Sequence, residues 1–290
     1  MTRASTLRDR IVREIESSGF GALGLHVLAG DDSAEHRWAA DERIDIQSVA
    51  KGVCVLAAGM AADEGLISVD APVAATVPGW QLGAGVDEVT LRDLLTMSSG
   101  IDLPWSETMM TDWPDLAAEF LSRPTSGRDF QYSNASTYTA MRVLAEHVGD
   151  VHAYLEPRLF APLGIRDAQW ERCPNGRIIA GGGLFLRTEE MARIGRLIRD
   201  RGEWQGHRLI DAQWIDRMHS EWVPCGESPG YERYAFAGWD GPGPGWRLHG
   251  AYGQLLIFVD DTVVTITAED HAGADAVAAT IMHMIADGLA

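Results

Sequence analysis

Apolar residues recur along the chain at two spacings, one typical of helices and one typical of strands. Leu7, Ile11 and Ile15 share one face of a predicted N-terminal helix. Similar patterns predict helices over residues 48–64, 90–97, 114–121, 135–147, 152–159, 189–201 and 274–289. Residues favourable for strands occupy 22–29, 36–40, 255–259 and 263–268, with turns at 31–33 and 260–262. Residues 224–244 are rich in Gly, Pro and aromatic residues and are predicted to form a loop.

The order of these elements predicts an α+β fold. Strands near the two ends of the chain can share one antiparallel sheet, with the terminal helices packed on it. We therefore expect a sheet domain built from residues 1–60 and 172–290, and a helical domain inserted as residues 61–171. A ligand site is expected at the junction, because clefts between two such parts commonly bind ligands.

Composition narrows the classes of function. The 290 residues are 46% hydrophobic, so they can bury a large core, and their net charge is −18. So acidic a protein is not expected to bind nucleic acid or an anionic membrane surface. The sequence has no recognisable export signal and no apolar run long enough to span a bilayer. Cys54, Cys173 and Cys225 are widely spaced, which favours a reducing compartment, and we expect a cytoplasmic protein.

Lys51 is the only lysine in the chain, whereas every other residue in the total of 24 Lys and Arg is an arginine. A coding bias toward arginine explains the general loss of lysine but does not explain why one position kept it. Arginine stays protonated at any accessible pH, whereas a buried lysine can lose its proton and act as a base. The alternative is a lysine retained by chance on the solvated surface.

Ser48 precedes Lys51 by three residues, in the spacing S-x-x-K. Residues three apart on a helix lie on the same face, so the amine can approach the hydroxyl. Serine is a weak nucleophile until a base removes its proton. The free N–H groups at the start of a helix also favour developing negative charge. The alternative is that Ser48 only caps the helix.

Two further segments carry chemistry that suits such a pair. Tyr132 and Asn134 flank Ser133 between predicted helices, and a phenol can relay a proton while an amide orients a carbonyl. Read alone, this segment is equally typical of a loop tyrosine followed by a helix cap.

A glycine-containing segment, residues 249–254, lies directly before an apolar strand. Small residues on an edge strand let a substrate approach the backbone, and a free strand N–H can complete an oxyanion hole. Candidate substrate-binding residues here are His249, Gly250, Ala251 and Tyr252. The alternative is a glycine turn that simply leads into the strand.

In this order, the three segments resemble the motifs of the serine β-lactamase and penicillin-binding-protein superfamily, and the Tyr-Ser-Asn form resembles class C β-lactamases. Residues 94–101 and 181–193 also resemble segments of that family, and the similarity runs from about residue 21 to about residue 268. The resemblance implies a β-lactamase/transpeptidase-like fold. It implies that Ser48 is acylated while Lys51 and Tyr132 move protons. Asn134 would then bind the substrate.

The third motif departs from the family pattern of Lys or His, any residue, then Gly. Here the glycine is displaced to Gly250, so the second oxyanion donor is the backbone N–H of either Ala251 or Tyr252. Met97 also stands where the resembling segment has histidine. These departures bear on the choice of substrate more than on the reaction.

The sequence therefore predicts a cytoplasmic esterase or amidase that acts on a small molecule and needs no cofactor. No group of His and carboxylate residues has the spacing of a metal site, and the G-x-S-x-G turn of α/β-hydrolases is absent. The alternatives within the family are a β-lactamase, a D-amino-acid peptidase or an acyltransferase, whose pocket Trp222, Trp239 and Trp246 could line. A non-catalytic binding or sensor domain on the same scaffold is a further alternative. The oligomeric state is not predicted.

Overall fold

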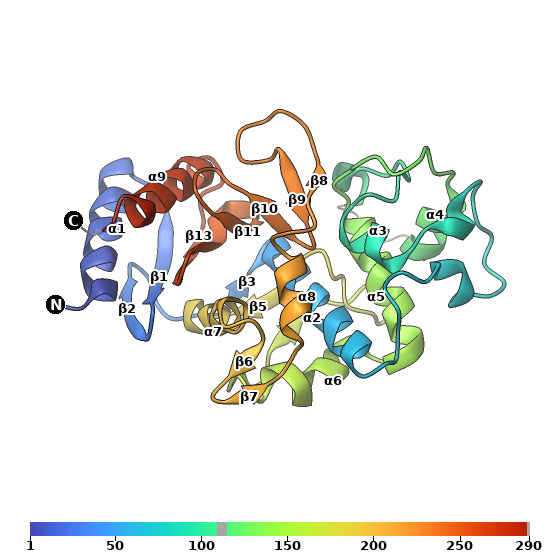
Figure 1. Cartoon of the computed structure of the whole chain (residues 1–290), viewed down its shortest axis with the longest axis horizontal. Coiled ribbons are helices and arrows are strands. Elements are labelled where there is room, and N and C mark those ends of the chain that lie inside the picture. The colour runs from blue at the N-terminus through green and yellow to red at the C-terminus, as the bar shows by residue number, and fades with distance from the viewer. Residues whose placement is uncertain (109–114, 289–290) are drawn as a thin grey trace.

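An antiparallel sheet of eight strands forms the centre of the computed structural model, which describes residues 1–108 and 115–288. Neighbouring strands follow the order β2-β1-β13-β12-β11-β10-β9-β8 (Figure 1). Their bounds are β1 (Ala22–Ala29), β2 (Asp32–Arg37), β8 (Val223–Pro224), β9 (Arg233–Ala235), β10 (Gly238–Asp240), β11 (Trp246–Gly250), β12 (Gln254–Val259) and β13 (Thr262–Ala268). The first and last strands of the chain are thus joined, because β1 pairs with β13 along its whole length.

Two small sheets accompany the large one. β3 (Ile44–Asp45), β5 (Leu184–Leu186) and β4 (Gln169–Trp170) form a three-stranded sheet in the order β3-β5-β4. β6 (Glu203–Trp204) and β7 (His207–Arg208) form a hairpin. The short β3 matters for the site, because it leads directly into the segment that carries Ser48.

Helices pack on both faces of the large sheet. The described helices are α1 (Arg3–Ser18), α2 (Ala50–Asp63), α3 (Leu91–Leu95), α4 (Leu116–Ser122), α5 (Asn134–Val148), α6 (Val151–Leu155), α7 (Thr188–Arg199), α8 (Ala212–Arg217) and α9 (Ala274–Ala286). Helices α1 and α9 lie side by side against one face, and α7 packs against the other (Figure 1). Alternation along β12 explains this arrangement: Leu255 and Ile257 join the core under the terminal helices, whereas Leu256 joins the core on the α7 side.

Local sequence explains where α1 begins and ends. The Thr2 hydroxyl accepts a hydrogen bond from the Ser5 N–H at the start, and Gly19 adopts φ +71° just after the end. Between them, Leu7 and Ile11 are buried on the face that meets the sheet. The amphipathic helix predicted from Leu7 onward is confirmed, and it begins one turn earlier, at Arg3.

Helix α2 is buried on every side, from Ala50 to Ala61, and joins the sheet to the helical region. Glycines allow this close packing. A Cβ at Gly52 would lie 2.5 Å from Leu248 Cδ1 of β11, and one at Gly59 would lie 2.2 Å from the Trp214 ring. The N-terminal end of α2 is therefore held directly against β11.

The structure corrects three predicted boundaries. The turn expected at 31–33 lies at residues 30–31, because Gly30 supplies the left-handed conformation (φ +60°), and the returning strand runs over 32–37 instead of 36–40. The segment expected to be a loop, 224–244, contains β9 and β10, which pair across a turn in which Phe236 and Ala237 have positive φ. Positions 114 and 289, the ends of two predicted helices, lie outside the described residues.

Along the sequence, the helical region falls between the two groups of strands that form the large sheet. Every strand of that sheet falls within residues 22–37 or 223–268, and α3 to α6 fall between these ranges. The division into domains at residues 60 and 172 stays a prediction. Within the described part of the chain, no helix has the length and apolar character that crossing a membrane requires.

Candidate active site

Ser48 and Lys51 face each other at the start of α2. Ser48 lies in a 3₁₀ turn, Gln47–Val49, that runs into the helix. The Lys51 amine is 2.8 Å from the Ser48 hydroxyl oxygen, and Lys51 is only 1% exposed. The Ser48 hydroxyl caps neither the turn nor the helix. The two side chains therefore meet one turn apart in a buried setting, as the S-x-x-K spacing predicts.

Lys51 Nζ has three oxygen partners among the described residues. Besides Ser48, it donates to the side-chain oxygen of Asn134 and to the carbonyl oxygen of Gly181, each at 2.8 Å. An ammonium has three protons to donate, whereas a neutral amine has two and a lone pair. The same geometry thus suits both states: the neutral amine donates to Asn134 and Gly181 and accepts the Ser48 proton.

The turn before Ser48 is strained. Gln47 has φ +52°, a conformation that a non-glycine residue rarely adopts. The Asp45 carboxylate holds it there, because one oxygen accepts from the Gln47 N–H and the other from the Gln47 side-chain amide. Asp45 also accepts from the Gly183 N–H. Burial raises the pKa of Asp45, and the hydrogen bonds from the two backbone N–H groups oppose that rise.

Asn134 and Tyr132 enter the site from the start of α5. Asn134 is the first residue of that helix and points its oxygen at Lys51. The Tyr132 ring lies against the amine, with Nζ 4.9 Å from the ring centroid. Ser133 occupies the cap position, but its hydroxyl makes no capping hydrogen bond. The segment therefore contributes side chains to the site instead of serving only as a helix cap.

Gly181 is a site residue that the sequence analysis did not single out as one. Its carbonyl oxygen accepts from Lys51 at 2.8 Å and from the Ser48 hydroxyl at 3.4 Å. A Cβ at this position would lie 2.7 Å from the Asn134 side-chain oxygen, so only glycine fits. The run of three glycines at 181–183 was the available signal, because such a run often marks a close backbone approach.

The third motif lies on β11 and the 3₁₀ turn after it. His249 and Gly250 end β11, where they pair with β12 on one side. On the other side β10 pairs only with Trp246 and Arg247, so the end of β11 forms a local edge beside the site. A Cβ at Gly250 would lie 2.6 Å from the Ile46 carbonyl oxygen, which explains the glycine.

Ala251 and Tyr252 belong to the turn Ala251–Gly253. Tyr252 has φ +58° and is 55% exposed, and its backbone N–H donates to His271 Nδ1 at 3.2 Å. Ala251, Tyr252 and His271 all line the same cavity. Both candidate oxyanion donors are therefore at the cavity wall near Ser48.

These segments meet around a cavity of about 730 Å³. Its described lining residues are Asp45, Gln47, Ser48, Leu116, Tyr132, Asn134, Tyr138, Cys173, Ile179, Gly181, Gly182, Gly183, Tyr231, Trp239, His249, Gly250, Ala251, Tyr252 and His271. A small-molecule substrate fits a volume of this size. All the candidate residues from the three motifs line it, except Lys51, which is buried behind Ser48.

Comparison with known proteins fits this geometry. A family model described as Beta-lactamase matches residues 12–282. This chain belongs to the beta-lactamase family. The predicted resemblance and the predicted α+β, β-lactamase/transpeptidase-like fold are confirmed.

Among its relatives in the family is the 6-aminohexanoate-dimer hydrolase of Paenarthrobacter ureafaciens, which is 29% identical over 242 residues. The match covers 75% of this chain and 60% of that protein, so the chain spans well under the full length of this relative. A class C beta-lactamase superposes with a TM-score of 0.77, at 13% identity, over 100% of this chain and 98% of the other. The D-amino acid amidase of Ochrobactrum anthropi SV3 gives a TM-score of 0.73, at 15% identity, over the whole of both chains.

Of the three tryptophans expected near the site, one lies in the cavity wall and two lie elsewhere. Trp239 lies on β10 and lines the cavity. Trp246 instead stacks on Phe258, with ring centroids 4.1 Å apart, and Trp222 lies under the Arg233 guanidinium. Only Trp239 is thus placed to contact a bound molecule in this cavity.

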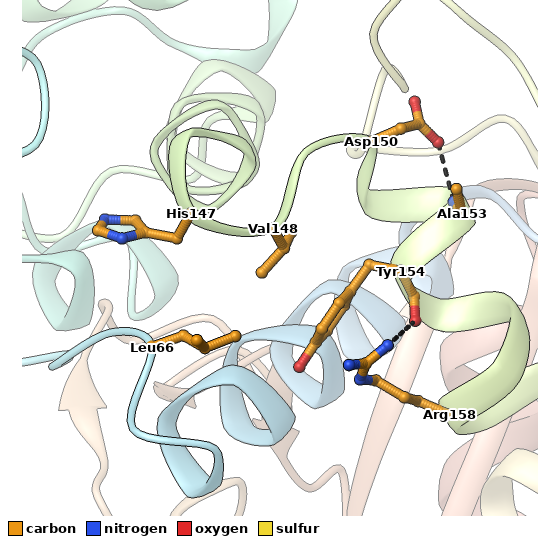
Figure 2. Close-up of a pocket in the computed structure, with 7 residues that line it drawn as sticks. All are labelled: Leu66, His147, Val148, Asp150, Ala153, Tyr154 and Arg158. Atoms are coloured by element: carbon orange, nitrogen blue, oxygen red, sulfur yellow. Dashed lines mark hydrogen bonds between the residues drawn. The ribbon is translucent and has the colours of Figure 1, made fainter.

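A second, shallower recess of about 400 Å³ lies where the ends of α5 and α6 meet the segment after α2 (Figure 2). Arg158 lines it but is paired with Glu64 at 2.6 Å, and Asp150 caps α6. This recess contains none of the motif residues. In residues 1–108 and 115–288, no cluster of His, Cys, Asp and Glu is arranged to hold a metal ion.

Proposed function

We propose that this chain is a serine acyl hydrolase that cleaves a carboxylic ester or amide through an acyl-enzyme, with Ser48 as the nucleophile and Lys51 as its base. The observation that carries the proposal is the 2.8 Å contact between the Lys51 amine and the Ser48 hydroxyl in a site where Lys51 is 1% exposed. A buried amine beside a hydroxyl, at the wall of a substrate-sized cavity, suits nucleophilic catalysis.

The first proton transfer follows from the hydrogen bonds around Lys51 Nζ. Neutral Lys51 accepts the Ser48 proton as Oγ forms a bond to the substrate carbonyl carbon. The ammonium that results has acceptors for all three protons: Ser48, Asn134 and Gly181. Tyr132, whose ring lies against Nζ, relays a proton to the leaving oxygen or nitrogen as its bond to the carbonyl carbon breaks. Water then attacks the acyl-enzyme, and Ser48 regains its proton.

Backbone N–H groups bind the developing oxyanion. The first donor is the N–H of Ser48, and the second comes from Ala251 or Tyr252 on the 3₁₀ turn. The Tyr252 N–H is held by His271 at 3.2 Å, a long hydrogen bond that a substrate oxygen can replace. Because the Asn134 oxygen binds Lys51, its amide NH₂ remains to meet a substrate carbonyl.

The substrate class follows from the cavity and the relatives. A volume of about 730 Å³ admits a small ester or amide. One relative in the family is named for hydrolysis of the 6-aminohexanoate dimer, and one solved structure with the same fold is named a D-amino acid amidase. The three cysteines in the described chain are free thiols, which suits the cytoplasmic location that we expected. Cell fractionation with an antibody tests that location.

The experiment is labelling by a fluorescent serine-directed phosphonate, read by intact mass and peptide mapping. We expect labelling at Ser48 that is lost in Ser48→Ala and retained in Ser33→Ala, a change of an exposed serine on β2. Lys51→Arg keeps the charge but lacks a base, so the labelling rate should fall by roughly 10²–10⁴. Tyr132→Phe should slow it as well, whereas Tyr154→Phe, a change in the second recess, serves as the matched control. Equal labelling of wild type and Ser48→Ala would refute the proposal.

Incubation with an ester substrate and with penicillin separates the alternatives. Acyl transfer would appear as slow release of the acyl group in water and fast release when an amine or alcohol is added. A β-lactamase would turn over penicillin, and a sensor domain would keep a stable penicillin adduct without turnover. Acyl transfer is the second candidate function. Trp239 lies in the cavity wall, where it can shelter an acyl acceptor from water, and this observation favours it.

A further inference from the structure

One side of the cavity, next to Tyr132, is an aromatic wall formed by Tyr132, Trp239, Tyr231 and His249. The Tyr132 and Trp239 ring centroids are 5.6 Å apart with an interplanar angle of 34°, and Tyr231 meets Trp239 edge-on at 4.8 Å. Phe130 and the buried Tyr234 pack behind them in the same cluster. Rings so packed offer a rigid, apolar surface with geometry suited to a planar group.

His249 is the polar member of this wall, and its hydrogen bonds fix its proton. The Tyr231 hydroxyl donates to the Asp275 carboxylate at 2.9 Å, because a carboxylate only accepts. The 2.9 Å bond between Tyr231 and His249 Nδ1 must then run from the imidazole N–H to the phenol oxygen. This assigns the proton of a neutral ring to Nδ1 and leaves Nε2 with a lone pair, which repels an anion.

The surroundings of His249 keep the ring neutral. Burial, together with the Arg247 guanidinium and His271, lowers the pKa of His249 to about 4, while Asp275 opposes the shift. Arg247 is itself fully buried and bonds to the Gly230 carbonyl and to Asp275. Its guanidinium therefore binds protein oxygens behind the wall and does not face a ligand in the cavity.

Charge in the rest of the cavity is unfavourable to anions. No Lys or Arg is present among its described lining residues, and the only carboxylate there, Asp45, is held by backbone N–H groups. The whole chain carries a net charge of −18, which adds a repulsive field for negative ligands. The Lys51 amine next to Tyr132 already has three oxygen partners, so a carboxylate placed against the aromatic wall would lose water without gaining a free cationic partner.

We infer that the leaving group of the substrate is an uncharged aromatic or bulky apolar group that packs on the wall of Tyr132, Trp239, Tyr231 and His249, and that a carboxylate in this position is rejected. The inference rests on the proposed function, because it is the role of Tyr132 in protonating the leaving atom that places the leaving group on this side of the cavity. A substrate whose leaving group would place a carboxylate against these rings is therefore selected against.

The test uses two ligands that differ only in charge: 4-butanamidobenzamide, which is neutral, and 4-butanamidobenzoate. Their binding to Ser48→Ala protein is measured by calorimetry, so no turnover is needed. We expect the neutral ligand to bind at least tenfold more tightly. Equal affinities, or tighter binding of the benzoate, would overturn the inference.

Two variants that add a cation to the cavity sharpen the test. His249→Lys in the Ser48→Ala background should reduce the preference at least threefold, whereas His249→Gln, which stays neutral, should keep it. Because a lysine next to the buried Arg247 can prevent folding, Tyr252→Lys at the exposed rim provides a second added cation with the same expected direction. An unchanged ratio in every folded cationic variant would refute charge as the cause.

The outcomes distinguish this inference from the proposed function. If wild-type protein fails to react with the phosphonate while Ser48→Ala still prefers the neutral ligand, the hydrolase assignment fails and the charge selectivity of the wall stands. If labelling at Ser48 succeeds but the benzoate binds as well as the benzamide, only the inference about the leaving group fails.

Discussion

The contact between β11 and the nucleophile turn gives a prediction that needs no knowledge of the substrate. A Cβ added by Gly250→Ala would lie 2.6 Å from the Ile46 carbonyl oxygen and 3.0 Å from Gln47 Cβ. A carbon and an oxygen need about 3.2 Å or more, so the strand and the turn must separate by roughly 0.6 Å. Both neighbours include backbone, which cannot rotate away. The oxyanion turn at 251–252 would move with the strand.

The expected effects are large enough to measure. Overpacking of this kind costs about 1–3 kcal/mol of the free energy of unfolding, which corresponds to a melting temperature lower by roughly 2–10 °C. A misplacement approaching 1 Å in a catalytic site costs up to about 10²-fold in rate, so we expect the phosphonate labelling rate to fall by roughly 10- to 100-fold.

The matched control is Gly195→Ala on α7. A Cβ there would lie 2.9 Å from Leu256 Cδ2 and 3.0 Å from Val263 Cγ1, which are ends of side chains on the opposite side of the sheet from α1. It can lower stability by a similar amount without touching the site, so its labelling rate should match wild type. The reasoning is refuted if Gly250→Ala labels within twofold of wild type, or if both variants lose rate in proportion to stability.

Two further predictions concern titration and thiol chemistry. The folded pKa of His249, about 4, lies below its unfolded value near 6.5, so its contribution is present above pH 6.5 and is lost as the pH falls toward 4. Urea unfolding should show wild type losing about 2 kcal/mol more than His249→Gln between pH 7 and pH 5, and equal losses would contradict this. Cys54 is fully buried, and burial raises the pKa of its thiol, so a disulfide reagent should modify it only after unfolding. Modification of Cys54 in the native protein, detected by peptide mapping, would show that α2 opens.

Much of the fold was predictable because its elements are locally consistent. Helix α1 has a periodic apolar face, a capping threonine and a terminating glycine, and the β12–β13 hairpin has two strongly apolar strands around an acidic turn. β9 and β10 were not predicted, because each is only three residues long and the turn between them contains Phe236 and Ala237. Those residues adopt positive φ without glycine, so tertiary packing decides their conformation.

The candidate site was predictable only where the chemistry resides in side chains. Ser48, Lys51 and Asn134 were expected from spacing and order, and the structure brings them within 2.8 Å contacts around one amine. The Gly181 carbonyl was missed because every residue has a carbonyl: the glycines at 181–183 indicate a close backbone approach, but they do not show which carbonyl accepts from Lys51. The network joining His249 to Asp275 was missed for a different reason: its members come from β11, the loop before β9 and the start of α9, which only the folded chain brings together.

The geometry around Nζ accounts for a lysine in a chain that otherwise uses arginine. Its three oxygen partners, each at 2.8 Å, come from the 3₁₀ turn before α2, from α5 and from the 181–183 segment, and they surround a single nitrogen atom. A guanidinium spreads its protons over a plane and needs acceptors farther apart, and with 1% exposure Lys51 has no free space into which such a group could extend. Arginine also could not accept the Ser48 proton. Both the shape of the site and the proposed proton transfer therefore require an amine here, and neither requirement applies to the surface positions that carry arginine.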